Sequence, residues 1–164
     1  MSWREHKRLI TISDYYKMAE VGILKPEEKL ELIHGEILLK MPSSPYHAGH
    51  LMRLNALLGK KIVDKGIVSV KHPVRLDEYN EPEPDIALLK YKKDYYASAH
   101  PKPDEVLFIL EVSHTSLNFD RKIKGPLYAL SGIQTYIILD LENKQIELYN
   151  DPEKGKYLEK FVFQ

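Results

Sequence analysis

Two short apolar segments, each with a carboxylate at one end, restrict the fold of this chain more than any other feature. Residues 106–112 (VLFILEV) are apolar except for Glu111, and residues 86–89 (IALL) directly follow Asp85. Both segments are bounded by Pro, Asp or Ser, which is typical of buried β-strands. If the two strands run antiparallel, the start of the first lies beside the end of the second. The sequence therefore predicts that Asp85 and Glu111 are neighbours.

Glu111 needs a positively charged partner in this setting. Side chains alternate along a strand, so Glu111 is expected to share a sheet face with Leu107 and Ile109. A carboxylate on such a face is costly to bury alone, and it requires a metal ion or a lysine. The next basic cluster is residues 121–124 (RKIK), on what the pattern predicts is a helical turn after the strand.

Length and composition favour one domain, residues 1–164, with residues 1–12 as a loose N-terminal lead-in. The 24 basic and 24 acidic residues balance, so any nucleic-acid surface must be a local patch. The absence of cysteine excludes disulfides, thiolate zinc sites and a cysteine nucleophile. The N-terminus lacks the apolar core of a signal peptide, and no apolar run approaches membrane-spanning length. We therefore expect a cytoplasmic protein that has no membrane partner.

The region before the central strands is expected to begin with a helix over residues 14–20, capped by Ser13 and ended by Gly22. Another helical turn is expected at residues 26–28. Strands 30–33 and 36–39 would flank a tight hairpin or bulge at His34-Gly35. Glu31 on the first of them is either a third carboxylate of the central site or a solvated strand residue.

The longest helix is predicted from Tyr46 to about Lys65, with Ser44 as its cap and apolar residues at helical spacing. It would cover one face of the sheet. His47 and His50 lie one turn apart near its start, a spacing that can chelate a metal. Such histidines are more often exposed or hydrogen-bonded near a helix end. His47 is therefore a candidate for lining the site, and His50 a weaker one.

Further strands are expected at 67–70, 135–140, 146–149 and 157–163, with extended chain at 73–76. The Lys- and Tyr-rich loop 90–96 would suit a phosphate backbone with stacking bases, and it would equally suit an ordinary surface loop. A helix from about Leu117 to Ser131, capped by residues 114–116, would join two strands by a crossover. Asp120, Lys124 and Tyr128 are four apart and share one stripe of that helix, although Pro126 should kink it or mark its start.

Two carboxylates at adjacent strand ends with a lysine nearby form a known arrangement for phosphodiester hydrolysis. Mg²⁺ is bound by one or two carboxylates and retains waters, whose pKa it lowers. Asp85 and Glu111 would be the ligands, with the Val112 carbonyl as a third. Lys124 would orient or deprotonate the attacking water and stabilise charge. Glu31 could bind a second metal or hold a water. A glycosidase using the two acids lacks any pattern of an aromatic platform.

At this point the sequence resembles a family. The runs ELIHGEI (31–37), S-x-x-H (44–47), PDIALL (84–89) and ILEVSHTSLNFDRKIKGPLYALSGIQTYIILD (109–140) are similar to the Uma-type restriction endonucleases of the PD-(D/E)XK nuclease superfamily. The resemblance covers about residues 13–160. It implies an α/β (mixed α+β) fold with a restriction-endonuclease-like core, in which helices flank a mixed β-sheet. It also implies DNA cleavage that depends on a divalent metal, Mg²⁺ or Mn²⁺.

The resemblance places the two motif acids on Asp85 and Glu111. The superfamily's usual lysine position is Ser113 here, and the resemblance implies that Lys124 on the following helix substitutes for it. The family's early glutamate and its histidine fall on Glu31 and His47.

Two positions depart from the family pattern. Gln134-Thr135-Tyr136 replaces Glu-Tyr-Trp, and His34-Gly35 replaces Asp-Gly. Neither departure touches the proposed metal ligands, but both leave room for altered specificity or weak activity.

The leading hypothesis is an Mg²⁺-dependent endonuclease that acts on DNA, with Ser113, Asp120 and Tyr128 near the site. A homodimer is expected from the family, because a duplex cut needs two sites. The alternative is a weak or inactive nuclease-fold protein that binds nucleic acid or a protein partner. Ser113 and the neutral net charge favour the alternative, whereas the joint presence of Asp85, Glu111 and Lys124 argues against it.

Overall fold

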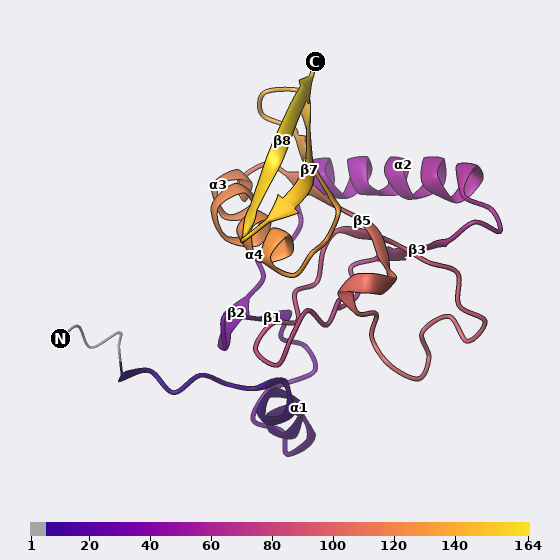
Figure 1. Cartoon of the computed structure of the whole chain (residues 1–164). Coiled ribbons are helices and arrows are strands. Elements are labelled where there is room, and N and C mark those ends of the chain that lie inside the picture. Colours follow the sequence, from indigo (N-terminus) through magenta and orange to yellow (C-terminus); the bar gives the residue numbers. More distant parts are fainter. Residues whose placement is uncertain (1–5) are drawn as a thin grey trace.

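The computed structural model describes residues 6–164 (Figure 1). Its helices are α1 (Ile12–Glu20), α2 (Pro45–Lys61), the 3-10 helix η2 (Pro103–Glu105), α3 (Leu117–Phe119), the π-helix η3 (Asp120–Lys124) and α4 (Gly125–Leu130). Its strands are β1 (Leu30–Ile33), β2 (Glu36–Leu39), β3 (Ile67–Val70), β4 (Ile86–Leu89), β5 (Val106–Ser113), β6 (Thr135–Asp140), β7 (Gln145–Glu153) and β8 (Lys156–Phe163).

A six-stranded sheet in the order β3-β4-β5-β6-β7-β8 forms the centre of the molecule. The β5–β6 pair is parallel and the other pairs are antiparallel, so the predicted mixed sheet is confirmed. Strands β1 and β2 form a separate hairpin around His34-Gly35, as predicted. Figure 1 shows this hairpin and α1 at one end of the molecule and the β7–β8 hairpin at the other.

The two faces of the sheet are covered by different helices, so that strand alternation decides what each residue contacts. On one face, Leu51 of α2 packs in a cluster with Leu110 and Val112. On the other face, Tyr128 of α4 packs in a cluster with Ile109. Glu111 is two residues after Ile109 on β5, so its side chain lies on the same face of the sheet and points toward α4. The mixed sheet flanked by helices agrees with the predicted fold class.

The N-terminal predictions need three corrections. Helix α1 begins at Ile12, because Thr11 and not Ser13 is its cap and forms a capping box with Asp14. Residues 26–28 form a turn without a helix. The segment expected to be a loose lead-in is tied down at its end, since the Ile10 N–H donates to the Gly35 carbonyl at 2.9 Å. Residues 1–5 of that segment lie outside the described residues.

Helix α2 has the predicted start but ends early. Ser44 caps it by accepting a hydrogen bond from the His47 N–H at 3.2 Å, and Pro45 occupies the first turn, where its missing N–H has no consequence. The helix ends at Lys61, short of the predicted Lys65, and Asp64 adopts a left-handed φ of 62°.

The predicted helix over residues 117–131 is interrupted. A π turn at Asp120–Lys124 separates α3 from α4, and the Gly125 N–H donates to the Asp120 carbonyl. Pro126 lies in the first turn of α4, so it marks a helix start, one of the two outcomes expected. The wider turn nevertheless leaves Asp120, Lys124 and Tyr128 all buried.

Leu107 is not on the buried face expected for it. The register between β4 and β5 shifts at Leu88/Leu89, so that Leu89 pairs with Val106. Val106 is consequently buried, while Leu107 is 39% exposed. The irregularity lies at the far end of β5 from Glu111 and leaves the pairing there unchanged.

Within residues 6–164, no helix combines the length and the apolar character needed to cross a membrane.

Candidate active site

Asp85 and Glu111 are neighbours, as the antiparallel arrangement predicts. Ile86 pairs with Leu110 across β4 and β5, which brings the residue before β4 beside the end of β5. The Asp85 N–H donates to Glu111 Oε2 at 3.1 Å, and the Val112 N–H donates to Asp85 Oδ2 at 2.9 Å. Each carboxylate is thus held by the backbone of the opposite strand.

Lys124 is the positively charged partner of Glu111. Its Nζ lies 3.0 Å from Glu111 Oε1 and 3.4 Å from Glu31 Oε2. The hydroxyl of Tyr128 donates to the same Glu111 oxygen at 3.0 Å. Glu31 also accepts a hydrogen bond from the Glu83 N–H at 3.1 Å. Glu31 therefore reaches the central cluster and is not the solvated strand residue of the alternative interpretation.

Burial dominates the protonation of this cluster. Desolvation is the largest of the causes that raise the pKa of Glu111 to about 8, and the nearby charges of Asp120 and Asp85 act in the same direction. The charge of Lys124 acts in the opposite direction. Desolvation would lower the pKa of Lys124, but Glu111, Glu31 and Asp120 together raise it above its ordinary value. Lys124 therefore stays protonated. Its position suits neutralising and orienting nearby groups more than accepting a proton.

Asp85 is held differently. Burial would raise its pKa, but hydrogen bonds from His47 and from the Val112 N–H, together with the charge of Lys71, lower it below the ordinary value. His47 Nε2 lies 3.0 Å from Asp85 Oδ2. Among the described residues, the other oxygen, Oδ1, has only the Lys71 ammonium near it, at 3.9 Å. Asp85 thus presents an ionised carboxylate with one open oxygen.

Ser113 occupies the position where the superfamily's lysine was expected, and its hydroxyl binds an acid. Ser113 Oγ and Ser116 Oγ each donate to Asp120 Oδ2 at 2.6 Å. Burial raises the pKa of Asp120. Ser113 is therefore a buried support for Asp120, without a charge of its own.

A cavity of about 630 Å³ opens onto the acids. Its wall includes Asp85, Glu111, Glu31, Lys124, His47 and Asp120, six of the residues predicted for the site. Ser113 and Tyr128 are fully buried behind it and do not line it. His50 also lies outside the wall; its Nδ1 is 2.9 Å from the Tyr46 carbonyl oxygen, so the two histidines do not converge.

Sequence reasoning missed other residues of this wall, notably Ser43 and Lys71. Lys71 directly follows β3, which pairs with β4, and this position is the signal that could have identified it.

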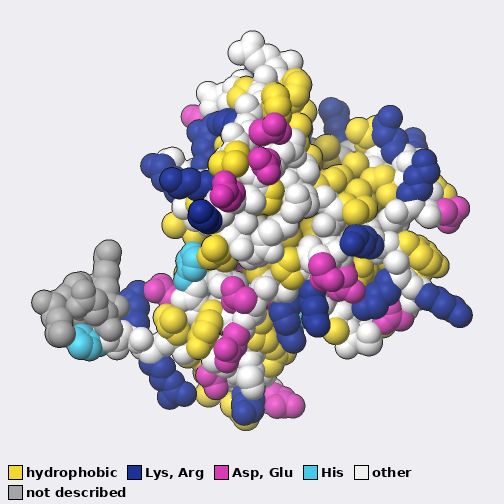
Figure 2. Space-filling view, viewed as in Figure 1, with side chains coloured by type: hydrophobic (Ala, Val, Ile, Leu, Met, Phe, Trp, Pro, Cys, Tyr) yellow, Lys and Arg dark blue, Asp and Glu magenta, His cyan; other side chains and the backbone are white. Residues whose placement is uncertain are grey.

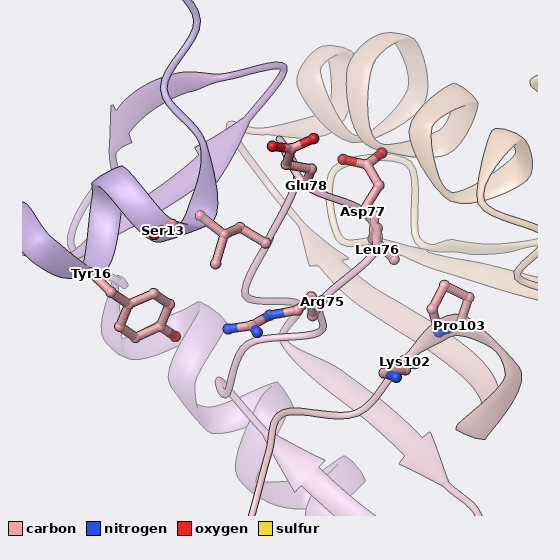
Figure 3. Close-up of a pocket in the computed structure, with 9 residues that line it drawn as sticks. Ser13, Tyr16, Arg75, Leu76, Asp77, Glu78, Lys102 and Pro103 are labelled. Atoms are coloured by element: carbon pink, nitrogen blue, oxygen red, sulfur yellow. The ribbon is translucent and has the colours of Figure 1, made fainter.

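A second cavity, of about 580 Å³, shares no wall residue with the first (Figure 3). Its wall includes Tyr16, Arg75 and Lys102. Arg75 Nε donates to Glu81 at 2.8 Å, and its guanidinium lies over the ring of Tyr16. The Lys- and Tyr-rich loop 90–96 contributes to neither cavity.

The donor set of the first cavity fits a hard divalent cation. Among residues 6–164, no group of three His, Cys, Asp or Glu side chains is arranged to hold a metal. Asp85 and Glu111 supply two carboxylates, however, and Mg²⁺ commonly takes one or two and completes its shell with water and phosphate oxygens. The predicted third ligand, the Val112 carbonyl, belongs to the residue whose N–H binds Asp85.

A comparison with family models matches residues 12–164 to Uma2, described as "Putative restriction endonuclease". The chain belongs to the Uma2 family. The predicted family is thereby confirmed, and with it a nuclease assignment at the level of the family.

A crystal structure of "a putative nuclease belonging to DUF820" from Anabaena variabilis is similar to the whole fold. Its TM-score is 0.70 at 13% sequence identity, and the match covers 94% of this chain and 84% of that one. The comparison with curated proteins gave no match. The fold of this chain is therefore also found in a solved structure.

Proposed function

We propose that this Uma2 protein is an endonuclease that hydrolyses DNA phosphodiester bonds with the help of Mg²⁺ or Mn²⁺. One observation carries the proposal: two carboxylates, Asp85 and Glu111, are joined across adjacent strands at the wall of a cavity, with Lys124 3.0 Å from Glu111. An ion pair between Lys124 and Glu111 that only stabilised the fold would require neither Asp85 nor a cavity beside it.

Asp85 and Glu111 would hold the metal, together with the Val112 carbonyl. A metal bound there would lower the pKa of a coordinated water and neutralise charge on the phosphate. His47 fixes the orientation of Asp85 through the 3.0 Å contact, and the Val112 N–H fixes the same oxygen. The open oxygen of Asp85 then faces the cavity.

Lys124 acts as a fixed cation. Its ammonium lies beside Glu111 and Glu31, and its field stabilises negative charge that builds up on the phosphate. Glu31 lines the cavity beside it and can hold a water or a second metal. The raised pKa of Lys124 supports the orienting and charge-stabilising role over the deprotonating one.

DNA is the proposed partner, through local contacts and not through net charge. Figure 2 shows basic and acidic side chains interspersed over one face, with no field of a single sign covering it. Cleavage of both strands of a duplex requires two sites, so we also propose a homodimer. We also propose a cytoplasmic location, because a nuclease that acts on DNA must share a compartment with it.

The test is a plasmid-nicking assay with purified protein and Mg²⁺ or Mn²⁺. Nicking by the wild type, and its loss in Glu111→Ala, in Lys124→Ala and in the presence of a chelator, is the expected result. Glu27→Ala is the matched control, because Glu27 is exposed in a turn and does not line the cavity. Nicking that survives in Glu111→Ala would overturn the assignment.

One observation favours a second candidate, an inactive nuclease-fold protein that binds nucleic acid or a protein partner. Ser113 takes the position of the superfamily lysine and donates to Asp120. Calorimetric titration with Mg²⁺ or Mn²⁺ separates the two candidates. An endonuclease must show a site that disappears in Asp85→Ala, whereas a wild type that binds no metal at millimolar concentration favours the inactive protein.

A further inference from the structure

Lys71 occupies an unusual place beside the acids. It follows β3, and its N–H donates to the Asp85 carbonyl at 3.1 Å, which continues the β3–β4 pairing by one step. Its φ of 53° lies in the left-handed region, which is unfavourable for a residue with a Cβ. Seven other described residues besides glycine share a positive φ, so the contacts of the side chain decide what Lys71 can do.

The side chain of Lys71 lines the cavity, as does that of Lys124. Its Nζ is 2.5 Å from Ser43 Oγ and 3.9 Å from Asp85 Oδ1. The side chain is 36% exposed, whereas that of Lys124 is 6% exposed. Lys71 therefore presents an ammonium group that an incoming ligand can contact, and Lys124 does not.

The third lysine of the cavity wall is already engaged. Lys40 Nζ lies 3.1 Å from Glu83 Oε2 and 2.9 Å from the Glu83 carbonyl oxygen. Among the lysines that line this cavity, Lys71 has the most distant carboxylate partner. An ion pair at 3.9 Å on a partly exposed side chain adds little to stability, so structural support alone gives no reason for a lysine here.

We propose that Lys71 and Ser43 form a phosphate subsite, which binds the phosphodiester group that is hydrolysed at Asp85 and Glu111. This inference rests on the proposed nuclease function and names the groups that contact its substrate. The ammonium and the hydroxyl are both hydrogen-bond donors, as the non-bridging oxygens of a phosphodiester require. Their location beside the open oxygen of Asp85 places the phosphate next to the acids.

The experiment compares Lys71→Asn and Lys71→Arg with the wild type. Asparagine tolerates a left-handed φ and so preserves the turn, whereas arginine preserves the charge. Lys65→Asn is the matched control, an exposed lysine between α2 and β3 that lies outside the cavity wall. Two quantities are measured: plasmid-nicking kcat/KM, and the salt dependence of binding to a short fluorescent DNA duplex.

We expect Lys71→Asn to lower kcat/KM by roughly 10- to 100-fold and to reduce the slope of log affinity against log salt by about 0.9, the contribution of one phosphate contact. Lys71→Arg should retain most of both, and Lys65→Asn should change neither. The change in slope supports the subsite whether or not the wild type nicks DNA. An unchanged slope in Lys71→Asn overturns the subsite, while nicking by the wild type would still support the nuclease. A wild type that binds DNA but never nicks it overturns the nuclease alone.

Discussion

The carboxylate of Asp85 and the carboxylate of Glu111 are each bound by the backbone of the strand that carries the other. The Asp85 N–H donates to Glu111 Oε2 at 3.1 Å, and the Val112 N–H donates to Asp85 Oδ2 at 2.9 Å. Because Val112 belongs to β5 and Asp85 directly precedes β4, the register of these two strands fixes the position of the acids. A site built on strands is positioned more accurately than one built on loops.

Asp85→Asn should remove metal binding while preserving the sheet. The amide oxygen can still accept the Val112 N–H, so the backbone pairing persists, but the side chain no longer supplies a charged ligand. We expect Mg²⁺ affinity and nicking to fall by about 100-fold or more, as measured by calorimetry and plasmid assay. Asp104→Asn, an exposed acid on η2, is the control. Full activity in Asp85→Asn would contradict the proposed ligand set.

Lys124→Met should destabilise the fold because it leaves two acids without their cation. Lys124 Nζ contacts Glu111 at 3.0 Å and Glu31 at 3.4 Å in a buried setting. Removing one partner of a buried pair costs about 3–5 kcal/mol in the free energy of unfolding, to be measured by urea denaturation. Addition of Glu111→Gln removes one of the two acids that lose their cation, and it should restore part of the lost free energy of unfolding. If the double variant is no more stable than Lys124→Met, the ion pair is not the cause.

The proximity of Asp85 and Glu111 could be predicted from the sequence, because each strand is recognisable from its own residues. Apolar runs with period two and their bounding residues locate β4 and β5, and an antiparallel pairing then forces Asp85 beside Glu111. Lys124 was selected from the stripe that it shares with Asp120 and Tyr128, and the family resemblance then agreed with that choice over the neighbouring Arg121 and Lys122. The intervening π turn was not predictable, since it depends on how Pro126 and the buried Asp120 are accommodated together.

The remainder of the site depends on tertiary pairing. Lys71 follows the predicted strand 67–70, but its place beside Asp85 depends on the pairing of β3 with β4, which the sequence of one segment does not give. Leu107 was misplaced for a similar reason, because the register shift opposite Leu89 is a property of two strands together. Periodicity in one segment cannot reveal an irregularity in its pairing.

The raised pKa of Glu111 predicts how stability depends on pH. An acid whose pKa rises from 4.5 to about 8 on folding binds more protons in the folded state. Its contribution is therefore fully present below pH 4.5 and is lost as pH rises toward 8. Relative to Glu111→Gln, which cannot titrate there, the wild type should lose up to about 1 kcal/mol per pH unit in this window. If the free energy of unfolding changes with pH in the same way in both proteins, the pKa of Glu111 is not raised.

The same shift predicts that metal binding competes with a proton. Glu111 must be ionised to act as a ligand, so Mg²⁺ affinity should rise with pH up to about 8 and level off above it. Calorimetry in buffers of different ionisation enthalpy should detect proton release on binding at neutral pH. Proton release that is absent at neutral pH would mean that Glu111 is already ionised in the metal-free protein.

Glu147 provides a test of structure that is separate from the active site. Its buried carboxylate on β7 accepts hydrogen bonds from Arg121 and Tyr149 and pairs with Lys160 at 3.2 Å. Burial would raise its pKa, but these partners lower it to about 2. Glu147 does not line the cavity that contains Asp85 and Glu111.

Glu147→Gln should therefore weaken the fold without removing a proposed ligand. We expect a loss of about 1–3 kcal/mol in the free energy of unfolding at neutral pH, measured by urea denaturation, and nicking by the folded variant should persist. A carboxyl with a lowered pKa contributes stability that is present above 4.5 and is lost as pH falls toward 2. The gap between wild type and variant should narrow over that interval. A gap that stays constant would assign the loss to packing, because packing does not titrate.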